Sequence, residues 1–567
     1  MTENRNFIAR LYYRALFPNI IAVLGGTVNV FFDSVFIGRK LGDTGLESVN
    51  QCLPVYLLLC TIGSLYASGA SFLSSHAIGA DDSAEGKRIF QGALLDSLLV
   101  GGVFCLLGFA FSGNIANMLA TERSCGYVYL YLRITFLGGI TKILLYIPYF
   151  YLRLEGKHRQ AMTAMLTMTF LNIVLDYLFL FVFDFGIKGA AWASVIATSV
   201  AAVMSFAFLW AGKGSFQPGL KFLRISDRTA IFRYGSPMAL NNLLSSARIL
   251  VVNLILGSMG IVGLVPIFAI VNNLNEFSIC IQNGVPQTGA AMTGIFYGEK
   301  DARSVRRTVN TELFAGAALS LVFAVFLALF PAKLGALFGS GADCAFAVRC
   351  LAASLVFATV NSVMSYTYNA VGQVAAANAV TVCRSFAAVA FFALVFRGLG
   401  ERIWLFYPCS ELFTFALIAA GGFYIARRKR LMPFYLIDDS LERSGSSVSF
   451  TVECSDEKIC GASEKIRSFC EQNDFTKKET MVISLALEEL MTIITQKSRP
   501  SDGFMDVRVL AWENKRIIRI RSAGRRYNPI EAQDGSLDYM GVKMICGLAS
   551  RTEYLSALGV NTLIIYI

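Results

Sequence analysis

The sequence contains few residues of the kinds that form zinc sites or disulfide frameworks. Only two of its 567 residues are histidine, and no two of its thirteen cysteines stand in a Cys-x-x-Cys pair. Structural zinc sites and disulfide scaffolds both need such closely spaced ligands or partners. We therefore expect no metal centre, and we expect Cys344 and Cys350 to be isolated apolar residues rather than a disulfide.

Charged residues are also scarce, and this scarcity excludes an ordinary soluble protein. They make up 16% of the chain, whereas hydrophobic residues make up 55% and the mean hydropathy is +0.56. Soluble domains carry about 25% charged residues. The composition predicts a polytopic, all-α membrane protein with a smaller soluble part.

The charge that is present is unevenly distributed. The part after Pro433 has 17 Lys and Arg residues against 19 Asp and Glu residues, so the part up to Pro433 carries the whole basic excess behind the net charge of +11. Lys and Arg concentrate in the cytoplasmic loops of membrane proteins. The excess therefore needs no nucleic-acid partner.

Apolar stretches long enough to cross a bilayer recur along the chain as far as Arg430. A bilayer core about 30 Å thick needs about 20 mostly apolar residues in a helix. An even number of spans puts both termini on one side, and the Lys and Arg distribution predicts that this side is the cytoplasmic face of the plasma membrane. The twelve predicted spans are 15–38, 50–78, 88–111, 126–150, 162–183, 188–212, 230–257, 262–296, 308–330, 346–370, 378–396 and 403–426.

The two halves of this region resemble each other in sequence. LYYRALFPNII around Pro18 matches AIFRYGSPMAL around Pro237, and short turns of acidic and then basic residues begin at Gly79 and at Gly298. Both pairs have the same offset in the numbering, from 18 to 237 and from 79 to 298. The repeat predicts two six-helix lobes of parallel topology around a central cavity, an architecture typical of transporters.

Ionisable and polar side chains fall at a common depth in the first six spans. Asn172 and Asp176 share one face of span five, because they are four residues apart in a helix. Counting from the outer end of each span at about 1.5 Å per residue puts Asp33, Tyr131, Asp176 and Ser194 about 8–10 Å below the outer surface. Carboxyl groups are costly inside a membrane and mark functional sites. We expect these five residues to form a cation-coupling site.

The residue types leave two coupling ions open. A buried carboxyl group can take up a proton near neutral pH. Carboxylate, amide, hydroxyl and phenol oxygens can instead hold Na⁺ as hard ligands. Either mechanism predicts that Asp33→Asn abolishes coupling, and neither mechanism needs a cofactor.

The eighth predicted span is unusually polar for a membrane helix. Such a span is expected to line water or substrate rather than lipid. Glu276 has two interpretations, because it can attract a cationic substrate or pair with Arg248 of span seven. The candidate substrate-cavity residues are Asn272, Asn273, Glu276, Gln282, Asn283 and Gln287.

Several of these motifs together resemble the multidrug and toxic compound extrusion (MATE) family. They are ALFP, a span-one aspartate followed by FIGRKLG, the Gly-x-x-Arg-Gln-Ala-Met loop, FLNIVLDY, GIKGAAWAS and the internal repeat. The resemblance covers about residues 7–430. It implies a V-shaped, two-lobe antiporter that exports organic cations or other amphipathic compounds against H⁺ or Na⁺.

Within that family the sequence is similar to the DinF-like branch. The five cation-site residues correspond to the Asp, Tyr, Asn, Asp and Thr of that branch, with Ser194 in place of the Thr. In the NorM-like branch an acidic residue follows the proline of span seven by eight positions, and Ser245 occupies that place here. The resemblance therefore implies a cation site in the first lobe only.

The chain after Pro433 is expected to form a soluble α/β domain. Its order of elements resembles the histidine-kinase-like ATPase fold in its anti-sigma-factor form, and ISLALEELM resembles the first nucleotide-binding helix of that fold. The predicted elements are a strand at 447–454, helices at 457–473 and 477–496, strands at 505–512 and 516–522, a helix after Met540, and strands at 552–556 and 561–567.

The residues that would bind nucleotide in this tail are largely replaced. The Mg²⁺-binding Asn expected four residues after Glu489 is Ile493, and the adenine-reading Asp is Ser522, which precedes Gly524 by two residues. Only Gly541 remains of the Gly-rich lid. ATP thereby loses its most specific contacts. We predict a degenerate regulatory domain that does not bind ATP, and a transporter rather than an enzyme.

Three functions fit these observations. The first is an antiporter with a regulatory tail, which the cation-site residues favour. The second is a lipid-linked precursor flippase of the same superfamily, which fourteen spans and a strongly basic cavity would favour. The third is a transporter-like sensor whose tail binds a cytoplasmic protein. The expected domains are an N-lobe at 1–212, a linker at 213–229, a C-lobe at 230–430, a second linker at 431–446 and the tail domain at 447–567.

Overall fold

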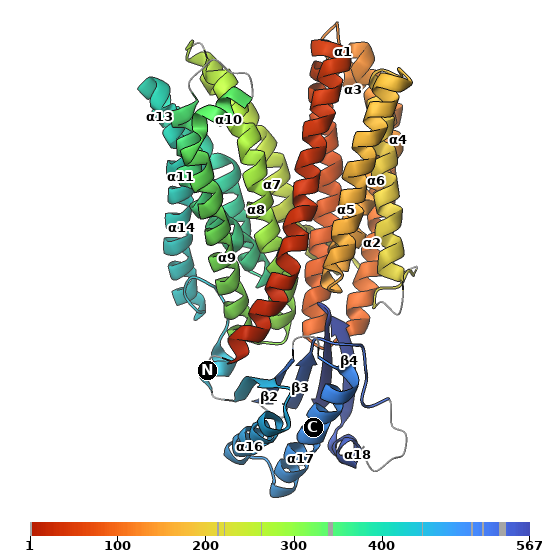
Figure 1. Ribbon diagram of the computed structural model, residues 1–567, viewed down its shortest axis with the longest axis vertical. Coiled ribbons are helices and arrows are strands. Elements are labelled where there is room, and N and C mark those ends of the chain that lie inside the picture. Colours follow the sequence, from red (N-terminus) through yellow and green to blue (C-terminus); the bar gives the residue numbers. More distant parts are fainter. Residues whose placement is uncertain are drawn as a thin grey trace.

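The computed structural model shows a bundle of long helices with a small α/β domain at one end (Figure 1). It describes the chain except for residues 1–2, 212–214, 220, 262, 338–343, 445, 501–502, 513–514 and 532–539. The helices form two lobes that diverge away from the α/β domain and converge beside it. We call the two ends of the bundle the tail end and the far end.

The first lobe is built from the first half of the helical region. Helix α1 (Glu3–Gly79) contains two spans, because Gly42 has a non-helical backbone (φ 65°, ψ −160°) at the far end. Helix α5 ends in a π-helical turn at Leu178–Val182. The remaining helices of this N-lobe are α2 (Ser83–Ala110), α3 (Ser112–Leu119), α4 (Cys125–Leu154), α5 (His158–Tyr177) and α6 (Ile187–Trp210).

The second lobe repeats this plan. Its last two long helices are joined through a 3₁₀ segment, Arg397–Leu405, in which Gly400 is non-helical (φ 60°, ψ −126°). A π-helical turn, Cys383–Ala387, joins α12 to α13. The helices of this C-lobe are α7 (Ile225–Ser258), α8 (Leu264–Gly298), α9 (Ala302–Leu329), α10 (Pro331–Leu337), α11 (Ala345–Ala370), α12 (Val374–Val382), α13 (Ala388–Phe396) and α14 (Phe406–Lys429).

Among the described residues, eleven helical stretches are long and apolar enough to cross a membrane. The last of them, Val374–Lys429, has 56 residues and contains the break at Gly400. The sequence-based prediction counts this stretch as two spans, which is the whole difference between eleven and twelve. The chain is a multi-pass membrane protein on either count.

The two turns that join the second and third spans of each lobe have the same geometry. Asp81 and Lys300, which are equivalent in the repeat, both adopt positive φ values of 65° and 55°. Asp82 and Asp301 then cap the next helix by accepting hydrogen bonds from the backbone N–H three residues later. A carboxylate at this position satisfies a free N–H and complements the helix dipole. The sequence repeat is therefore a repeat of backbone structure.

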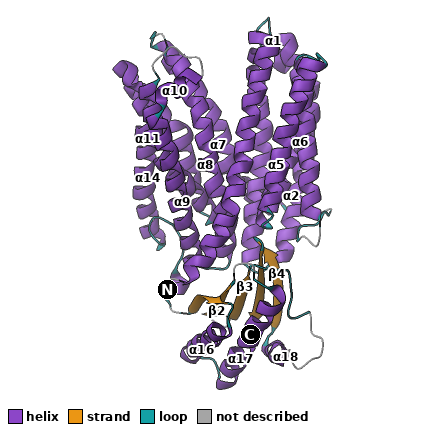
Figure 2. Ribbon diagram, in the orientation of Figure 1, coloured by secondary structure: helices purple, strands orange, loops and turns teal. Residues whose placement is uncertain are grey.

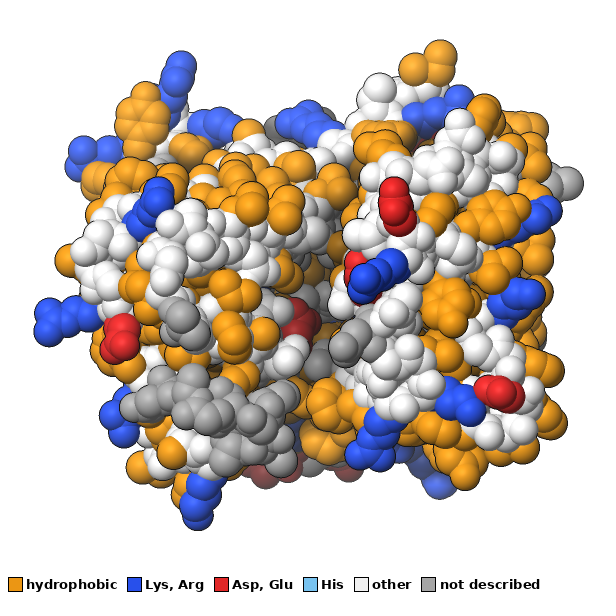
Figure 3. Space-filling view, turned by 90° about the horizontal axis from the view of Figure 1, so that it is seen from above, with side chains coloured by type: hydrophobic (Ala, Val, Ile, Leu, Met, Phe, Trp, Pro, Cys, Tyr) orange, Lys and Arg blue, Asp and Glu red, His pale blue; other side chains and the backbone are white. Residues whose placement is uncertain are grey.

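These two turns touch each other at the tail end. A Cβ atom built on Gly79 would lie 2.1 Å from the carbonyl oxygen of Ile295, and one built on Gly298 would lie 2.5 Å from that of His76. Only glycine allows so close an approach of two backbones. The lobes are therefore in direct contact at the tail end, whereas Figure 3 shows a groove between them at the far end.

The tail domain is a five-stranded antiparallel sheet with helices on one face (Figure 2). The strand order is β1-β2-β3-β5-β4. A short helix α15 (Ser440–Arg443) precedes the domain. Its elements are β1 (Ser447–Glu453), α16 (Asp456–Gln472), α17 (Lys477–Ile493), β2 (Phe504–Trp512), β3 (Lys515–Ser522), α18 (Met540–Leu548), β4 (Arg551–Ala557) and β5 (Val560–Tyr566).

The two faces of this sheet have different chemistry because side chains alternate along each strand. Val507 and Ile518 belong to the apolar face, which packs with α16, α17 and α18 in one core. The opposite face carries Asp506, Arg508 and Arg519, and it lies against the helical bundle. A sheet face that would otherwise be solvated is thus covered by the membrane domain.

Candidate functional site

The N-lobe brings two carboxyl groups together in its interior. Asp33 of α1 and Asp176 of α5 lie within hydrogen-bonding reach of each other. Asn172, one turn before Asp176, donates its Nδ2–H to Asp176 Oδ2 at 2.7 Å. Asp176 is 1% exposed and Asn172 is 2% exposed. One oxygen of each carboxyl group, Oδ1, has no hydrogen-bond partner among the described residues.

The other two predicted site residues differ in their placement. Tyr131 of α4 lies close enough to both Asp33 and Asp176 for electrostatic interaction with them. Ser194 of α6 is half-buried, and no hydrogen bond joins its hydroxyl group to the other four residues in the described part of the chain. The structure therefore brings four of the five residues together.

A lysine beside this carboxyl pair was missed by the sequence reasoning. Lys142 of α4 interacts electrostatically with Asp33, and its ammonium group lies within hydrogen-bonding reach of the Tyr56 hydroxyl group. Its Nζ also lies 4.8 Å from the centre of the Tyr56 ring. A lysine near the middle of an apolar span is a clear sequence signal, because such a charge needs an internal partner.

The C-lobe interior contains a different polar network. Glu411 of α14 forms an ion pair with Arg384 at 3.2 Å and accepts a hydrogen bond from Asn361 Nδ2 at 2.8 Å. Arg384 also donates to Gln282 Oε1. Glu411 was not singled out in the sequence, although its place in a predicted span marks it as clearly as Lys142.

The polar residues of the eighth predicted span, which is α8, are only partly gathered around cavities. Asn272, Gln282 and Asn283 line a cavity of about 730 Å³ inside the C-lobe. Asn273 is exposed and does not line this cavity, so its role as a substrate-cavity residue stays a prediction. Glu276 interacts electrostatically with Arg248 but forms no ion pair with it in the described part of the chain, and it lines neither of the two largest cavities described.

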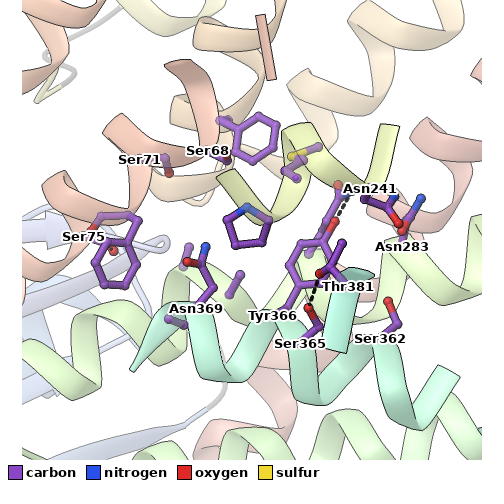
Figure 4. A pocket seen from close by; sticks show the side chains of 18 of the residues that line it. Ser68, Ser71, Ser75, Asn241, Asn283, Ser362, Ser365, Tyr366, Asn369 and Thr381 are labelled. Atoms are coloured by element: carbon purple, nitrogen blue, oxygen red, sulfur yellow. Dashed lines mark hydrogen bonds between the residues drawn. The ribbon is translucent and has the colours of Figure 1, made fainter. Parts of the chain in front are cut away.

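A larger cavity of about 910 Å³ lies between the two lobes (Figure 4). Its N-lobe wall includes Ser68, Ser71 and Arg153, and its C-lobe wall includes Gln287 and Tyr366. Because both lobes contribute to its wall, any movement of one lobe against the other changes its shape. Figure 4 shows a largely uncharged polar lining of serine and asparagine side chains around aromatic rings.

The tail domain binds both repeated turns through buried arginines. Arg519 of β3 forms an ion pair with Asp81 of the N-lobe turn at 2.5 Å. Arg521, two residues later on the same strand, pairs with Glu299 of the C-lobe turn. Arg508 of β2 donates to the carbonyl oxygen of Glu299 at 3.0 Å and is 2% exposed. One sheet face therefore holds the ends of both lobes.

The β4–β5 hairpin adds backbone hydrogen bonds to the N-lobe. Leu558 N–H donates to Leu154 O at 2.9 Å, and Gly559 N–H donates to Glu155 O at 3.2 Å. Gly156 follows directly, with φ 77°, and a Cβ atom there would lie 2.1 Å from Gly559 N. Leu558 also belongs to one apolar cluster with residues of both lobes. The tail is thus packed as part of the core at the tail end of the helical bundle.

Burial changes the acid–base properties of this interface. Burial, together with the smaller effect of the nearby Asp301 carboxylate, raises the pKa of Asp506 from 3.8 to about 8. Burial also lowers the pKa of Arg521 from 12.5 to about 10. Arg521 donates to Asp506 Oδ2 at 2.9 Å, which provides a partner for this carboxyl group. Charged groups this deeply buried need such partners.

The expected remnants of a nucleotide site are held in close contacts within the tail. Glu489 accepts a hydrogen bond from Gly541 N–H at 2.6 Å, at the start of α18. A Cβ atom on Gly524 would lie 2.6 Å from the carbonyl oxygen of Ser498. Ser522 is buried in β3, where it pairs with β5, and Ile493 is buried at the end of α17. Among the described residues, no group of three or more His, Cys, Asp and Glu residues is placed to hold a metal ion.

The comparison with protein families explains the internal sequence repeat. The MatE family model matches the chain twice, at residues 18–178 and 237–394. These matches begin at Pro18 and Pro237, the first anchors of the repeat. The chain belongs to the MatE family. It is therefore a transporter-family membrane protein whose two lobes are copies of one MatE unit.

Individual relatives are more distant. Multidrug export protein MepA from Staphylococcus saprophyticus is 28% identical over 246 residues, which are 43% of this chain and 53% of that protein. MepA from Staphylococcus aureus is 27% identical over 244 residues, covering 42% and 53%. The chain thus matches only about half the length of these curated relatives.

Solved structures of the family share the fold of the helical part. One is the outward-facing conformation of a multidrug resistance MATE family transporter of the MOP superfamily, with a TM-score of 0.69 and 22% identity. Another, from Pyrococcus furiosus, is described as having a binding pocket of reverse polarity, and it has the same TM-score and identity. Each alignment covers 74% of this chain and 96% of the other chain.

Proposed function

We propose that this protein is a secondary active antiporter of the DinF-like branch, with twelve spans, that exports amphipathic organic compounds by multidrug efflux. Organic cations or other amphipathic molecules are its substrate class, and H⁺ or Na⁺ is its coupling ion. The observation that carries the proposal is the pair formed by Asp33, which is half-buried, and Asp176, which is buried, inside the N-lobe. No resident cofactor is part of this function.

The chemistry of the carboxyl pair favours H⁺ as the coupling ion. Two carboxyl groups this close to each other favour holding one proton between them, because two bare carboxylates repel. Lys142 beside Asp33 already supplies a positive charge to the site, which disfavours Na⁺ at the same place. Proton uptake at the pair from one side of the membrane and release to the other side would drive movement of the lobes.

The test is efflux of fluorescent dyes from proteoliposomes under separately imposed pH and Na⁺ gradients. The wild-type protein is expected to respond to the pH gradient, and Asp33→Asn is expected to abolish that response. Ser194→Ala is the matched control, since no hydrogen bond joins its hydroxyl group to the carboxyl pair in the described part of the chain. A flux that ignores both gradients in all three proteins would overturn the antiporter function.

We also propose that the tail is a regulatory domain on the cytoplasmic side and that it holds the cytoplasmic gate closed. Arg519 binds the N-lobe turn and Arg521 binds the C-lobe turn, where Gly79 and Gly298 touch. An inward-facing state requires these turns to separate, so at least one arginine must lose its carboxylate. Loss of a single partner leaves a buried charge unpaired, which costs about 3–5 kcal/mol.

A charge exchange tests this gate. Arg519→Asp is expected to release the tail, increase access to the cavity from the cytoplasmic side and raise the efflux rate. Adding Asp81→Arg restores an ion pair of reversed polarity and should restore the low rate. Arg467→Asp is the control, because Arg467 is an exposed residue of α16. An unchanged rate in Arg519→Asp, together with intact tail docking, would contradict the proposal.

The tail is further proposed to work without nucleotide and through a cytoplasmic protein partner. Glu489 is occupied by the Gly541 backbone, and Ser522 is buried at the end of β3 without a carboxylate to read an adenine base. Calorimetry of the full-length protein in detergent is expected to detect no ATP binding. Binding at sub-millimolar affinity would show that the site is functional.

A further inference from the structure

The cavity between the lobes has a positive charge that nothing in its wall balances. Two arginines, Arg153 and Arg384, line it, and none of the described residues that line it is acidic. Arg384 is neutralised from behind, because Glu411 pairs with it at 3.2 Å and Gln282 accepts from its second nitrogen. Arg153 has no carboxylate partner in the described part of the chain.

Arg153 is almost fully buried, with 3% of its surface exposed. Its Nη1–H donates to Gln287 Oε1 at 2.8 Å, but Nε and Nη2 have no hydrogen-bond partner among the described residues. The rings of Tyr149 and Phe150 lie 5.4 and 5.7 Å from its guanidinium carbon. An unpaired buried cation is costly, whereas a guanidinium group with free N–H groups is well suited to binding a planar anion.

Neighbouring groups extend this donor-rich wall. Gln287 Nε2–H donates to the Tyr366 hydroxyl oxygen at 3.3 Å, which leaves the Tyr366 O–H free to donate to a ligand. Both Arg153 and Arg384 lie close enough to that hydroxyl group to interact with it electrostatically. The aromatic side chains Phe72 and Phe150 form an apolar surface in the same cavity. Donors and rings together match a molecule with one anionic group and an aromatic body.

The repeat shows that this charge is specific to one lobe. The turn after α4 and the turn after α11 share their hydrogen-bond pattern, with Gly156 at φ 77° and Gly372 at φ 76°. Arg153 and Asn369 stand three residues before these glycines, and both line the cavity. The same backbone position thus carries a cation in the N-lobe and a neutral amide in the C-lobe. The turn itself does not need the arginine.

We propose that this cavity binds amphipathic organic anions, with a carboxylate or sulfonate group on Arg153 and Tyr366 and the apolar body against Phe72 and Phe150. This inference rests on the proposed transport function and narrows its substrate class from amphipathic compounds in general to aromatic anions. Within that broader class, organic cations are disfavoured in this cavity because they would meet the uncompensated charge of Arg153.

Two dyes with the same xanthene skeleton test the substrate class: a carboxylated fluorescein as the anion and a rhodamine as the cation. Binding is measured by fluorescence anisotropy with the full-length protein in detergent, which needs no gradient and no transport. The wild-type protein is expected to bind the anion at least about tenfold more tightly than the cation. Tighter binding of the rhodamine would overturn the proposal, whatever the transport assay shows.

Variants then locate the site. Arg153→Gln should weaken binding of the anion by about tenfold or more, and Arg153→Lys should keep part of it because the charge remains. Arg133→Gln, an exposed position on the same helix, is the matched control and should leave binding unchanged. Equal loss of both dyes in Arg153→Gln, with Arg153→Lys behaving in the same way, would mean that the arginine has only a structural role.

Transport in proteoliposomes separates this proposal from the more general one. Gradient-driven flux of the anion, lost in Arg153→Gln, supports both. Selective binding of the anion without gradient-driven flux would contradict the antiporter function and leave the substrate site intact. Gradient-driven flux of the rhodamine alone would contradict the substrate class and leave the antiporter function intact.

Discussion

The two lobes have the same backbone plan but different chemistry. Their tail-end turns match in backbone conformation and capping, yet among the described residues the pair of Asp33 and Asp176 has no counterpart in the C-lobe. The offset that relates Gly79 to Gly298 places Val252 at the position of Asp33. The offset that relates Gly156 to Gly372 places Phe392 at the position of Asp176. The two lobes therefore share the residues that shape turns and helix contacts, whereas their interior residues differ.

The C-lobe interior shows what replaced the carboxyl pair. Glu411 and Arg384 form a neutral pair there, whereas Asp33 and Asp176 are two acids near one lysine. A neutral pair keeps its charge state through a transport cycle, but two adjacent acids must exchange a proton when their surroundings change. The difference between the lobes thus supports the proposed coupling role of the first lobe and a fixed framework in the second.

The largest expected effect comes from removing the carboxyl group of Asp176, which distinguishes the N-lobe interior from that of the C-lobe. Asp176→Asn should lower gradient-driven efflux by about tenfold or more, because the shared proton is lost. Glu411→Gln should reduce efflux less and leave its dependence on the pH gradient intact, since it removes only the partner of Arg384. Initial rates at several imposed pH gradients measure both. If Glu411→Gln abolishes the gradient response and Asp176→Asn does not, the roles of the two lobes are reversed.

A second prediction uses the matched glycines. Gly156 and Gly372 have the same positive φ, so alanine adds about 1 kcal/mol of backbone strain at either position. Only at Gly156 does the added Cβ atom also meet the tail, at 2.2 Å from the Leu558 carbonyl carbon. Gly156→Ala should therefore release the β4–β5 hairpin, and Gly372→Ala should not. Hydrogen exchange of residues 551–566 is the measurement, and equal protection in the two variants would refute the prediction.

The smallest expected effect is a pH dependence of stability that arises at the interface between the tail and the two lobes. Burial raises the pKa of Asp506 to about 8, so the folded protein binds the proton of this carboxyl group more tightly than the unfolded chain does. The protonated carboxyl group therefore contributes its full stabilisation of the folded state below about pH 3.8, the ordinary pKa. This contribution is lost as the pH rises through about 8.

The melting temperature of the full-length protein should accordingly fall between pH 6 and pH 9, with Asp506→Asn showing a smaller fall. Arg521 does not contribute in this window, because its pKa is about 10 and it stays charged. A fall of the same size in both proteins would mean that another group is responsible.

Much of the architecture followed from local sequence patterns. Span-length apolar runs, alternating residues in the tail strands and the spacing of Pro18, Gly79, Pro237 and Gly298 predicted the helices, the five strands and the repeat. The observed strands begin and end within one residue of their predicted ranges. These features depend on side-chain periodicity and on backbone conformation, which a sequence expresses directly.

Other features depended on distances between segments far apart in the chain. The sequence marked Asp33 and Asp176 as costly, but only the packing of α1 against α5 brought them within reach of each other and of Lys142. It also left Ser194 apart from them and kept Asn273 outside the cavities. Helix rotation and the choice of neighbour decide such contacts, and neither is encoded in periodicity alone.

The sequence by itself determined a two-lobe membrane protein with an α/β tail and costly acids in its first half. Only the tertiary structure decided that the charged face of the tail sheet closes over both repeated turns and that Arg153 faces a cavity without a carboxylate. The physical reason is the same in both cases. A charge is visible in any sequence, but whether it is paired depends on which distant segment the fold places beside it.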